Sequence, residues 1–211
     1  MRWEVSIRGQ ETSVSDTATR RAEWETRYRT GHTAWQRESA NPALLTWLAQ
    51  GLLQPCRLLI PGCGRCHEVV TLAQQGFAVT GVDIAPAAIH GVRQLIEDAG
   101  VTAQVIQADL LDRDAPDPFD AVYDQTCLCA LDPSTRQDYE CQLFSWLRPG
   151  GQLFVLLMQA TNPDGPPFPC DLDTMHQLFQ DARWEWRDAE PLSIPHPAGL
   201  HELGCILTRR A

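Results

Sequence analysis

Two glycines after an apolar segment, and an acid about twenty residues later, are spaced to bind a nucleoside. The apolar residues 57–61 lead into Gly62 and Gly64, which allow a sharp turn and a close approach of the backbone to a ligand. Asp83 ends the next apolar segment, where a carboxylate accepts hydrogen bonds from two ribose hydroxyls. The residues expected to contact the ligand here are Pro61, Gly62, Gly64, Asp83 and Ile84. A simple tight turn and a helix cap at Asp83 remain the alternative interpretation.

The kind of nucleoside follows from what the glycine turn lacks. A dinucleotide site would have a third glycine where His67 stands, and no Gly-Lys-Ser/Thr follows as in a phosphate-binding loop. The pattern therefore favours an adenosine ligand without phosphates, and S-adenosylmethionine meets that description. Asp109 is expected to face the adenine amino group and Leu110 to pack on the ring, although a helix cap or turn is an equal alternative for Asp109.

The elements that would position these residues alternate between strand and helix. Strands are predicted over 57–61, 77–82, 101–107, 119–123, 152–158, 183–188 and 203–209. Helices are predicted over 19–29, 42–50, 68–75, 86–99, 134–147 and 172–180, with Ser134 as one cap. This alternation indicates an α/β fold, Rossmann-like and doubly wound. Its sheet is expected to be mostly parallel and seven-stranded, with the last two strands forming an antiparallel edge.

Composition and charge limit the organisation and the partners. The 211 residues suit one domain over 19–211, preceded by a flexible arm over 1–18. A net charge of -10 argues against nucleic acid, because phosphate binding needs a positive surface. No signal peptide or membrane-length apolar run is seen, which predicts a cytoplasmic protein with eight reduced cysteines. We expect a monomer acting on a small molecule, with no metal, because the cysteine spacing is poor for zinc.

Several separate stretches resemble one family. They are residues 24–28 (Trp-Glu-Thr-Arg-Tyr), 31–35 (Gly-His-Thr-Ala-Trp), 61–64 (Pro-Gly-Cys-Gly), 119–126 leading to 130–133, and 165–168 (Gly-Pro-Pro-Phe). From Trp24 to Phe179 the chain resembles class I methyltransferases, and more narrowly the thiopurine methyltransferase family with its plant halide, thiol and thiocyanate branch. The glycine motif is common to many methyltransferases, whereas the amino-terminal aromatics and Gly-Pro-Pro-Phe are much more specific.

The resemblance implies S-adenosylmethionine as cofactor and an amino-terminal lid within residues 19–50. Trp24, Tyr28 and Trp35 would wrap the cofactor from this lid, since aromatic faces attract a sulfonium cation. Core packing is the alternative for these rings. Tyr28 stands where the family has tryptophan, and Gln125 where the thiopurine enzymes have arginine. The second difference argues against thiopurines. Residues 123–130 (Tyr-Asp-Gln-Thr-Cys-Leu-Cys-Ala) look closer to the halide and thiol branch.

Methyl transfer by in-line displacement to a small soft nucleophile is the expected reaction, with a thiol, thiopurine, halide or thiocyanate as acceptor. The pocket should lie beyond the carboxyl ends of the first and fourth strands. Its expected walls are Trp35, Asp124, Cys127, Pro167 and Phe168. Of these, Trp35 and Asp124 are assigned to catalysis and also to cofactor binding. A thiol would gain from a base, and His196, His201 and Asp171 are available, each equally interpretable as an ordinary surface residue.

Two other classes stay open from the residues. An NAD-dependent oxidoreductase would share the strand, glycine and acid order, although His67 counts against it. A nucleoside-binding module without catalysis would keep the fold and lose the chemistry.

Overall fold

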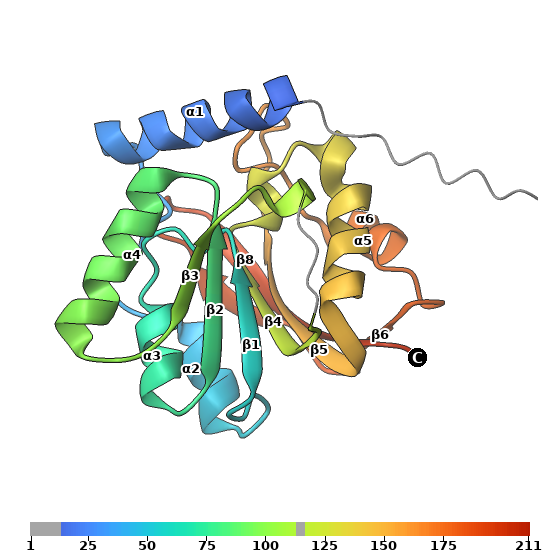
Figure 1. The fold of residues 1–211 in the computed structure, drawn as a ribbon. Coiled ribbons are helices and arrows are strands. Elements are labelled where there is room, and N and C mark those ends of the chain that lie inside the picture. Colours follow the sequence, from blue (N-terminus) through green and yellow to red (C-terminus); the bar gives the residue numbers. More distant parts are fainter. Residues whose placement is uncertain (1–13, 113–116) are drawn as a thin grey trace, which may run out of the picture.

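The computed structural model describes residues 14–112 and 117–211, and it contains one mixed sheet with helices on both faces (Figure 1). The strands are β1 (Arg57–Pro61), β2 (Ala78–Asp83), β3 (Gln104–Gln107), β4 (Phe119–Gln125), β5 (Leu147–Met158), β6 (Trp184–Trp186), β7 (Leu192–Pro195) and β8 (His201–Arg209). The α-helices are α1 (Val14–Thr30), α2 (Pro42–Ala49), α3 (Glu68–Gln74), α4 (Pro86–Ala99), α5 (Arg136–Trp146) and α6 (Leu172–Leu178).

The sheet has the order β3-β2-β1-β4-β5-β8-β6, and β7 also pairs with β8. The first five strands in this order are parallel to their neighbours, and β8 runs antiparallel to β5, β6 and β7. The strand order reverses direction between β1 and β4, which is where a doubly wound sheet opens a crevice for ligands. The predicted Rossmann-like fold with an antiparallel edge is confirmed.

Two apolar cores lie on opposite faces of the sheet because neighbouring strand residues point in opposite directions. Leu58 and Ile60 of β1 belong to the core beneath α2, α3 and α4. Leu59 belongs to the core beneath α5 and α6. Figure 1 shows these two sets of helices on either side of the sheet. Burial on both faces explains why these strands read as continuous apolar runs.

Helix α1 crosses the carboxyl ends of the parallel strands, at the top of Figure 1. Its Glu25 accepts a hydrogen bond from the backbone N–H of Ala87 at 2.8 Å, in the first turn of α4. That N–H has no partner within its own helix, so the Glu25 carboxylate supplies the missing acceptor. The negative charge of Glu25 also interacts favourably with the positive end of the α4 dipole. Arg65 donates to the Tyr28 carbonyl at 3.4 Å and adds a second attachment. The fold therefore places a helix over the edge where ligands bind.

Three sequence predictions need correction. The sheet has eight strands rather than seven, because the short β7 lies between prolines that hid its strand pattern. Helix α1 begins at Val14 rather than Thr19, so residues 14–18 of the predicted arm are helical, and residues 1–13 lie outside the described residues. Helix α5 begins at Arg136, and the side chain that caps the preceding turn is Asp132, which accepts from the Ser134 N–H at 2.8 Å.

Candidate active site

A cavity of about 350 Å³ lies between α1 and the carboxyl ends of the parallel strands. Its walls come from α1, from the segments after β1, β2, β3 and β4, from the end of β5, and from two later loops. Eleven lining residues matter for the chemistry: Trp24, Tyr28, Trp35, Gly62, Asp83, Ile84, Leu110, Thr126, Cys127, Pro167 and His196. Most of this wall is apolar, with a few charged groups set into it, which is typical of a small-molecule site.

Asp83 is the buried carboxylate at the end of β2, and only 6% of the residue is exposed. Its Oδ2 accepts from the Gly64 N–H at 2.9 Å and its Oδ1 accepts from the Ala85 N–H at 2.8 Å. Burial raises the pKa of Asp83 from 3.8 to about 6, against the lowering effect of these backbone hydrogen bonds. An ionised carboxylate accepts about four hydrogen bonds, so each oxygen retains capacity for one ligand hydroxyl.

The glycine turn after β1 fits closely against its neighbours. Gly62 and Gly64 have φ values of +56° and +53°, in the left-handed region that side chains rarely adopt. A Cβ on Gly62 would lie 2.9 Å from the sulfur of Cys127, and one on Gly64 would lie 2.5 Å from the hydroxyl of Tyr28. A turn in which two glycines leave the backbone uncovered, with a hydroxyl-accepting acid beside it, suits the sugar of an adenosine-type cofactor.

Three aromatic rings close the cavity from above. Trp35 makes edge-to-face contacts with Trp24 and Tyr28, with ring centroids 5.7 Å and 5.9 Å apart. All three line the cavity and also pack against one another. Aromatic faces attract a cation, so this wall suits a positively charged sulfonium. The residues of the site therefore fit S-adenosylmethionine at both its sugar and its sulfonium.

Asp109 lines the cavity, but its carboxylate already anchors α1. Its Oδ2 accepts from Arg20 at 2.5 Å and from the Thr17 hydroxyl at 2.9 Å, and its Oδ1 accepts from the Leu111 N–H at 3.1 Å. The predicted contact with an adenine amino group would share this carboxylate with three other donors. Leu110 lies on the cavity wall as expected.

Asp124, at the end of β4, is completely buried and is not among the cavity-lining residues of the described chain. Its Oδ2 accepts from the Tyr139 hydroxyl at 2.8 Å, and its Oδ1 accepts from the N–H groups of Cys127 and Leu128, both at 3.2 Å. Burial raises its pKa to about 6. The predicted wall position of Asp124 is wrong, because these three donors hold the carboxylate inside the protein. It fixes the loop that carries Cys127.

Three other predicted contacts do not line the cavity within the described residues. Gly64 is one of them, and its N–H donates to Asp83 at 2.9 Å. Pro61 is buried in β1 opposite Val82 and does not line the cavity within the described residues. Phe168 is likewise absent from the wall, and its N–H donates to the Cys129 carbonyl at 2.7 Å. That contact helps to place Pro167, the neighbouring residue that does line the cavity.

The sequence analysis missed Thr126 and did not single out His196. Thr126 has a φ of +59°, which is unusual for a β-branched residue and places strain at the cavity wall. Nothing in its sequence context signals this conformation. His196 lines the cavity, whereas the other two candidate bases do not: His201 is exposed on β8 and Asp171 caps α6 by accepting from the Thr174 N–H at 2.9 Å.

A doubly wound sheet with an acid after β2 and an aromatic helix over the strand ends defines the class I methyltransferase fold. The thiopurine S-methyltransferase family model matches residues 19–205, and the chain belongs to that family. It is an S-adenosylmethionine-dependent S-methyltransferase. The oxidoreductase alternative is therefore not retained.

Relatives of known name and a solved structure agree with this assignment. The chain is similar to thiocyanate methyltransferase 1 of Brassica oleracea, with 26% identity over 186 residues, 86% of this chain and 82% of the relative. It is also similar to thiopurine S-methyltransferase of Xanthomonas euvesicatoria pv. vesicatoria, with 32% identity over 183 residues, 77% of this chain and 82% of the relative. The fold matches the crystal structure of 1,6-didemethyltoxoflavin-N1-methyltransferase from Burkholderia thailandensis, with a TM-score of 0.74, 21% identity, and coverage of 93% and 90%.

Two features are absent from the part of the chain that the structure describes, residues 14–112 and 117–211. In that part of the chain, none of the helices combines the length and the apolar character that crossing a bilayer requires. The same residues contain no group of three or more His, Cys, Asp or Glu side chains arranged to hold a metal ion.

Proposed function

We propose that this methyltransferase acts on a small soft nucleophile of the thiol, thiocyanate or halide type rather than on a thiopurine. The observation that carries the proposal is the volume of the cavity, about 350 Å³. Cavities for drug-sized ligands span about 300–1,000 Å³, so this one lies near the lower limit before any acceptor is added. With the cofactor bound, the remaining room suits an acceptor of a few atoms.

The residues that would face the acceptor support the same choice. Cys127 and Pro167 give an apolar surface, which removes water from a soft nucleophile and so raises its reactivity. Gln125 replaces the arginine of the thiopurine enzymes, and its side chain accepts from the Tyr123 hydroxyl at 2.9 Å. It is thus held by its own strand, does not line the cavity within the described residues, and offers no cation to a purine ring.

The roles of the chain's residues follow from their positions. When bound, S-adenosylmethionine would supply a methyl group on a positively charged sulfur. Asp83, beside the turn at Gly62 and Gly64, would hold its ribose hydroxyls. Trp24, Tyr28 and Trp35, on the lid within residues 19–50, would cover the positive charge and exclude water. The site thereby acts by alignment and desolvation and needs no proton donor for the leaving group.

Asp124 has a positioning role in this proposal. Its contacts with the backbone after β4 hold Cys127 against Gly62, whose missing side chain leaves room for the sulfur. Trp35 lines the cavity, where it would contact a bound cofactor and acceptor, and it is the aromatic we assign to catalysis. The two residues predicted as catalytic therefore act differently, one by contact and the other through the loop it holds.

A comparison of methyl acceptors, each tested separately, tests the proposed substrate class. The purified protein is incubated with the methyl donor and hydrosulfide, thiophenol, thiocyanate, iodide or 6-mercaptopurine, and the methylated products are quantified. We expect kcat/KM for the best small acceptor to exceed that for 6-mercaptopurine by about tenfold or more, a usual effect of pocket size. Turnover of the thiopurine alone would contradict the proposal.

We also propose that the chain works as a cytoplasmic monomer, one domain over residues 19–211. All eight cysteines are free thiols, which is typical of a reducing compartment. The negative net charge disfavours nucleic acid as a partner. Sedimentation at micromolar concentration tests the oligomeric state, and a stable dimer would contradict it.

A further inference from the structure

The loop between α1 and α2 forms part of the cavity wall, although its own backbone hydrogen bonding is sparse. His32, Ala34 and Trp35 line the cavity from this loop. In the described part of the chain, residues 37–40 take no part in backbone-to-backbone hydrogen bonds. The position of this stretch of the wall therefore depends on contacts made by side chains.

A second stretch of the wall, the turn between β7 and β8, is held by its own hydrogen bonds. His196 and Ala198 line the cavity from this turn. The His196 N–H donates to the Leu200 carbonyl at 2.9 Å, and the Gly199 N–H donates to the His196 carbonyl at 3.0 Å. This turn is therefore a firm support for a neighbouring segment that lacks such bonds.

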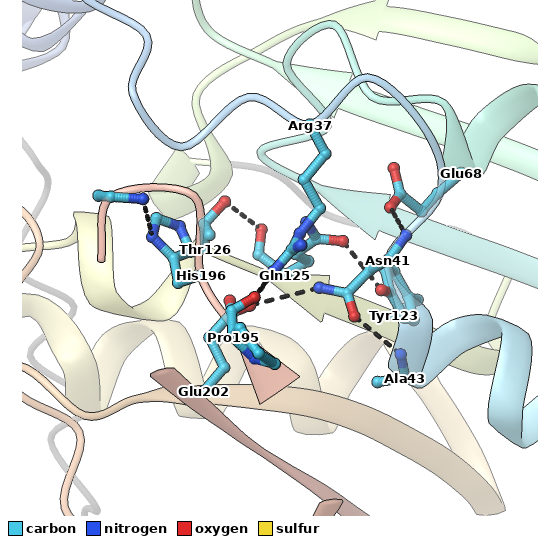
Figure 2. A network of polar contacts seen from close by, with 11 residues as sticks. Arg37, Asn41, Ala43, Glu68, Tyr123, Gln125, Thr126, Pro195, His196 and Glu202 are labelled. Atoms are coloured by element: carbon cyan, nitrogen blue, oxygen red, sulfur yellow. Dashed lines mark hydrogen bonds and ion pairs between the residues drawn. The ribbon is translucent and has the colours of Figure 1, made fainter. Parts of the chain in front are cut away.

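The side chain of Arg37 connects the loop to this turn. Its Nη2 donates to the Pro195 carbonyl at 2.6 Å and pairs with Glu202 of β8 at 3.2 Å, as Figure 2 shows. We call these two contacts the Arg37 clasp. The Arg37 side chain is only 15% exposed, and that of Glu202 is fully buried. One guanidinium thus joins two parts of the cavity wall that are 158 residues apart in the sequence.

Glu202 also holds the end of the loop that leads into α2. The Asn41 side-chain amide donates to the same Glu202 oxygen at 3.3 Å, and the Asn41 backbone N–H donates to Glu68 of α3 at 2.8 Å (Figure 2). Asn41 also caps α2 by accepting from the Ala43 N–H at 2.8 Å. The carboxylate that Arg37 pairs with is therefore itself held in place by other elements.

Stability alone is a poor explanation for a charged pair in this position. Burial raises the pKa of Glu202 above its usual value, and the charge of Arg37 offsets only part of that effect. Removing two charges from water can cost as much as their attraction returns, so apolar side chains in their place are often equally stable. A buried pair does fix the relative positions of the segments that it joins.

We propose that Arg37 is a positioning residue for methyl transfer, which holds the loop that carries Trp35 against the turn between β7 and β8. Arg37 does not line the main cavity within the described residues, so it acts through the wall that it holds. In-line displacement is sensitive to alignment, and a displacement of about 1 Å can lower the rate by about 100-fold. Without the clasp, Asp83 would still hold the cofactor, but the wall would fit the reacting groups less closely.

The test uses variants that separate positioning from stability. Arg37→Met removes the clasp and leaves Glu202 buried without its cation. The double variant Arg37→Met with Glu202→Gln removes both charges, and the new amide can still accept from Asn41. Arg37→Lys keeps a positive charge that can reach one of the two acceptors. Arg210→Met is the matched control, because it breaks a pair with Glu185 at 3.5 Å in which both side chains are exposed, beyond the other end of β8.

Four measurements are made on each protein. Turnover is measured at saturating S-adenosylmethionine with the acceptor that the wild type uses best, so a failure of the proposed substrate class leaves this test intact. Calorimetry gives the Kd for S-adenosylhomocysteine, and thermal unfolding gives the melting temperature. Fluorine NMR of protein labelled with fluorotryptophan reports the surroundings of Trp35, whose signal is assigned by its loss in Trp35→Phe.

We expect kcat to fall by about tenfold or more in Arg37→Met and equally in the double variant. The Kd for S-adenosylhomocysteine should rise by less than about threefold in both. The melting temperature should fall by about 10 °C in Arg37→Met, where a buried charge loses its partner, and return to within about 3 °C of the wild type in the double variant. The Trp35 signal should shift or broaden in both. Arg37→Lys should recover part of the lost kcat, and Arg210→Met should resemble the wild type.

Two results would overturn the proposal. If the double variant regains kcat together with stability, Arg37 and Glu202 serve only the fold. If kcat falls while the Trp35 signal stays as in the wild type, Arg37 does not act through the loop. Should Arg37→Met fail to fold, the double variant and Arg37→Lys decide the question by the same two criteria.

Discussion

The carboxyl ends of β2 and β4 lie on either side of β1, and each carries a buried aspartate with a pKa raised to about 6. Asp83 accepts one backbone N–H on each oxygen and lines the cavity. Asp124 accepts three donors, one of them the Tyr139 hydroxyl, and lies behind the wall. An acid at the end of a strand is thus a ligand-binding group or a structural one according to how many protein donors already occupy its oxygens.

The largest expected effect is the loss of cofactor affinity in Asp83→Ala. Two hydroxyls would lose a charged acceptor, and hydrogen bonds to charged groups contribute about 1.5–3 kcal/mol each. We expect the Kd for S-adenosylhomocysteine to rise by about 100-fold in calorimetry. Asp98→Ala, on the exposed part of α4, is the control and should bind normally. A rise of less than about threefold in Asp83→Ala would remove the distinction between the two aspartates.

Asp124→Ala should instead affect folding more than binding. The change leaves the Tyr139 hydroxyl and two backbone N–H groups without their acceptor inside the protein. Removing the carboxylate also removes the free-energy cost of burying it, which offsets part of the loss of these hydrogen bonds. We therefore expect the free energy of unfolding, measured in urea, to fall by about 2 kcal/mol. The Kd for S-adenosylhomocysteine, measured well below the unfolding midpoint, should change by less than about fivefold. A large loss of affinity with normal stability would return Asp124 to the binding site.

The pH dependence of binding sharpens the comparison further. In the proposed site the ionised form of Asp83 would accept the ligand hydroxyls, and its pKa of about 6 means that it becomes protonated as the pH falls below that value. We expect affinity for S-adenosylhomocysteine to fall by about tenfold from pH 7 to pH 5, and the Asp83→Asn variant to show a flat profile. Affinity of the wild type that stays constant down to pH 5 would contradict this assignment.

Ionisation of Asp83 lowers the stability of the ligand-free protein, although it strengthens ligand binding. A carboxyl whose pKa is raised on folding binds its proton more tightly in the folded state. Its contribution is therefore favourable below about pH 4 and is lost as the pH rises through about 6. From about pH 4 to pH 6, the stability of the wild type relative to Asp83→Asn should decline while the affinity for S-adenosylhomocysteine increases. Urea unfolding of both proteins at several pH values measures this stability difference.

The smallest expected effect is that of Tyr139→Phe, which removes one of the three donors to Asp124. The free energy of unfolding should fall by about 1 kcal/mol, the usual contribution of a single buried hydrogen bond. Tyr139 is fully buried, so the change leaves the packing of the ring in place. Cofactor affinity should be unchanged, and a tenfold loss of it would show that Asp124 acts on the ligand through this hydroxyl.

The sequence predicted the elements whose ends carry strong local signals. Helix α4 runs over Pro86–Ala99 as expected, because Pro86 suits a first turn and Gly100, with a φ of +63°, ends the helix. Asp83 could be predicted because its role depends on its position relative to a nearby glycine turn. These features are local, and the residues that create them are close in the chain.

The rest depends on partners that are distant in sequence. Asp124, like Asp83, is an acid at the end of an apolar strand, and the Tyr139 hydroxyl that fills its second oxygen comes from another element. His196 reaches the cavity because Arg37 holds the preceding carbonyl, 158 residues away in the chain. No spacing or periodicity contains these contacts, so a structure was needed to separate the binding residues from the supporting ones.

The most direct test is a crystal structure of the protein with S-adenosylhomocysteine. The account predicts that the two ribose hydroxyls lie within hydrogen-bond distance of the Asp83 oxygens and that Asp124 keeps the Tyr139 hydroxyl. An adenosyl group bound elsewhere, or one that draws Asp124 away from Tyr139 and leaves Asp83 without a ligand contact, would contradict it.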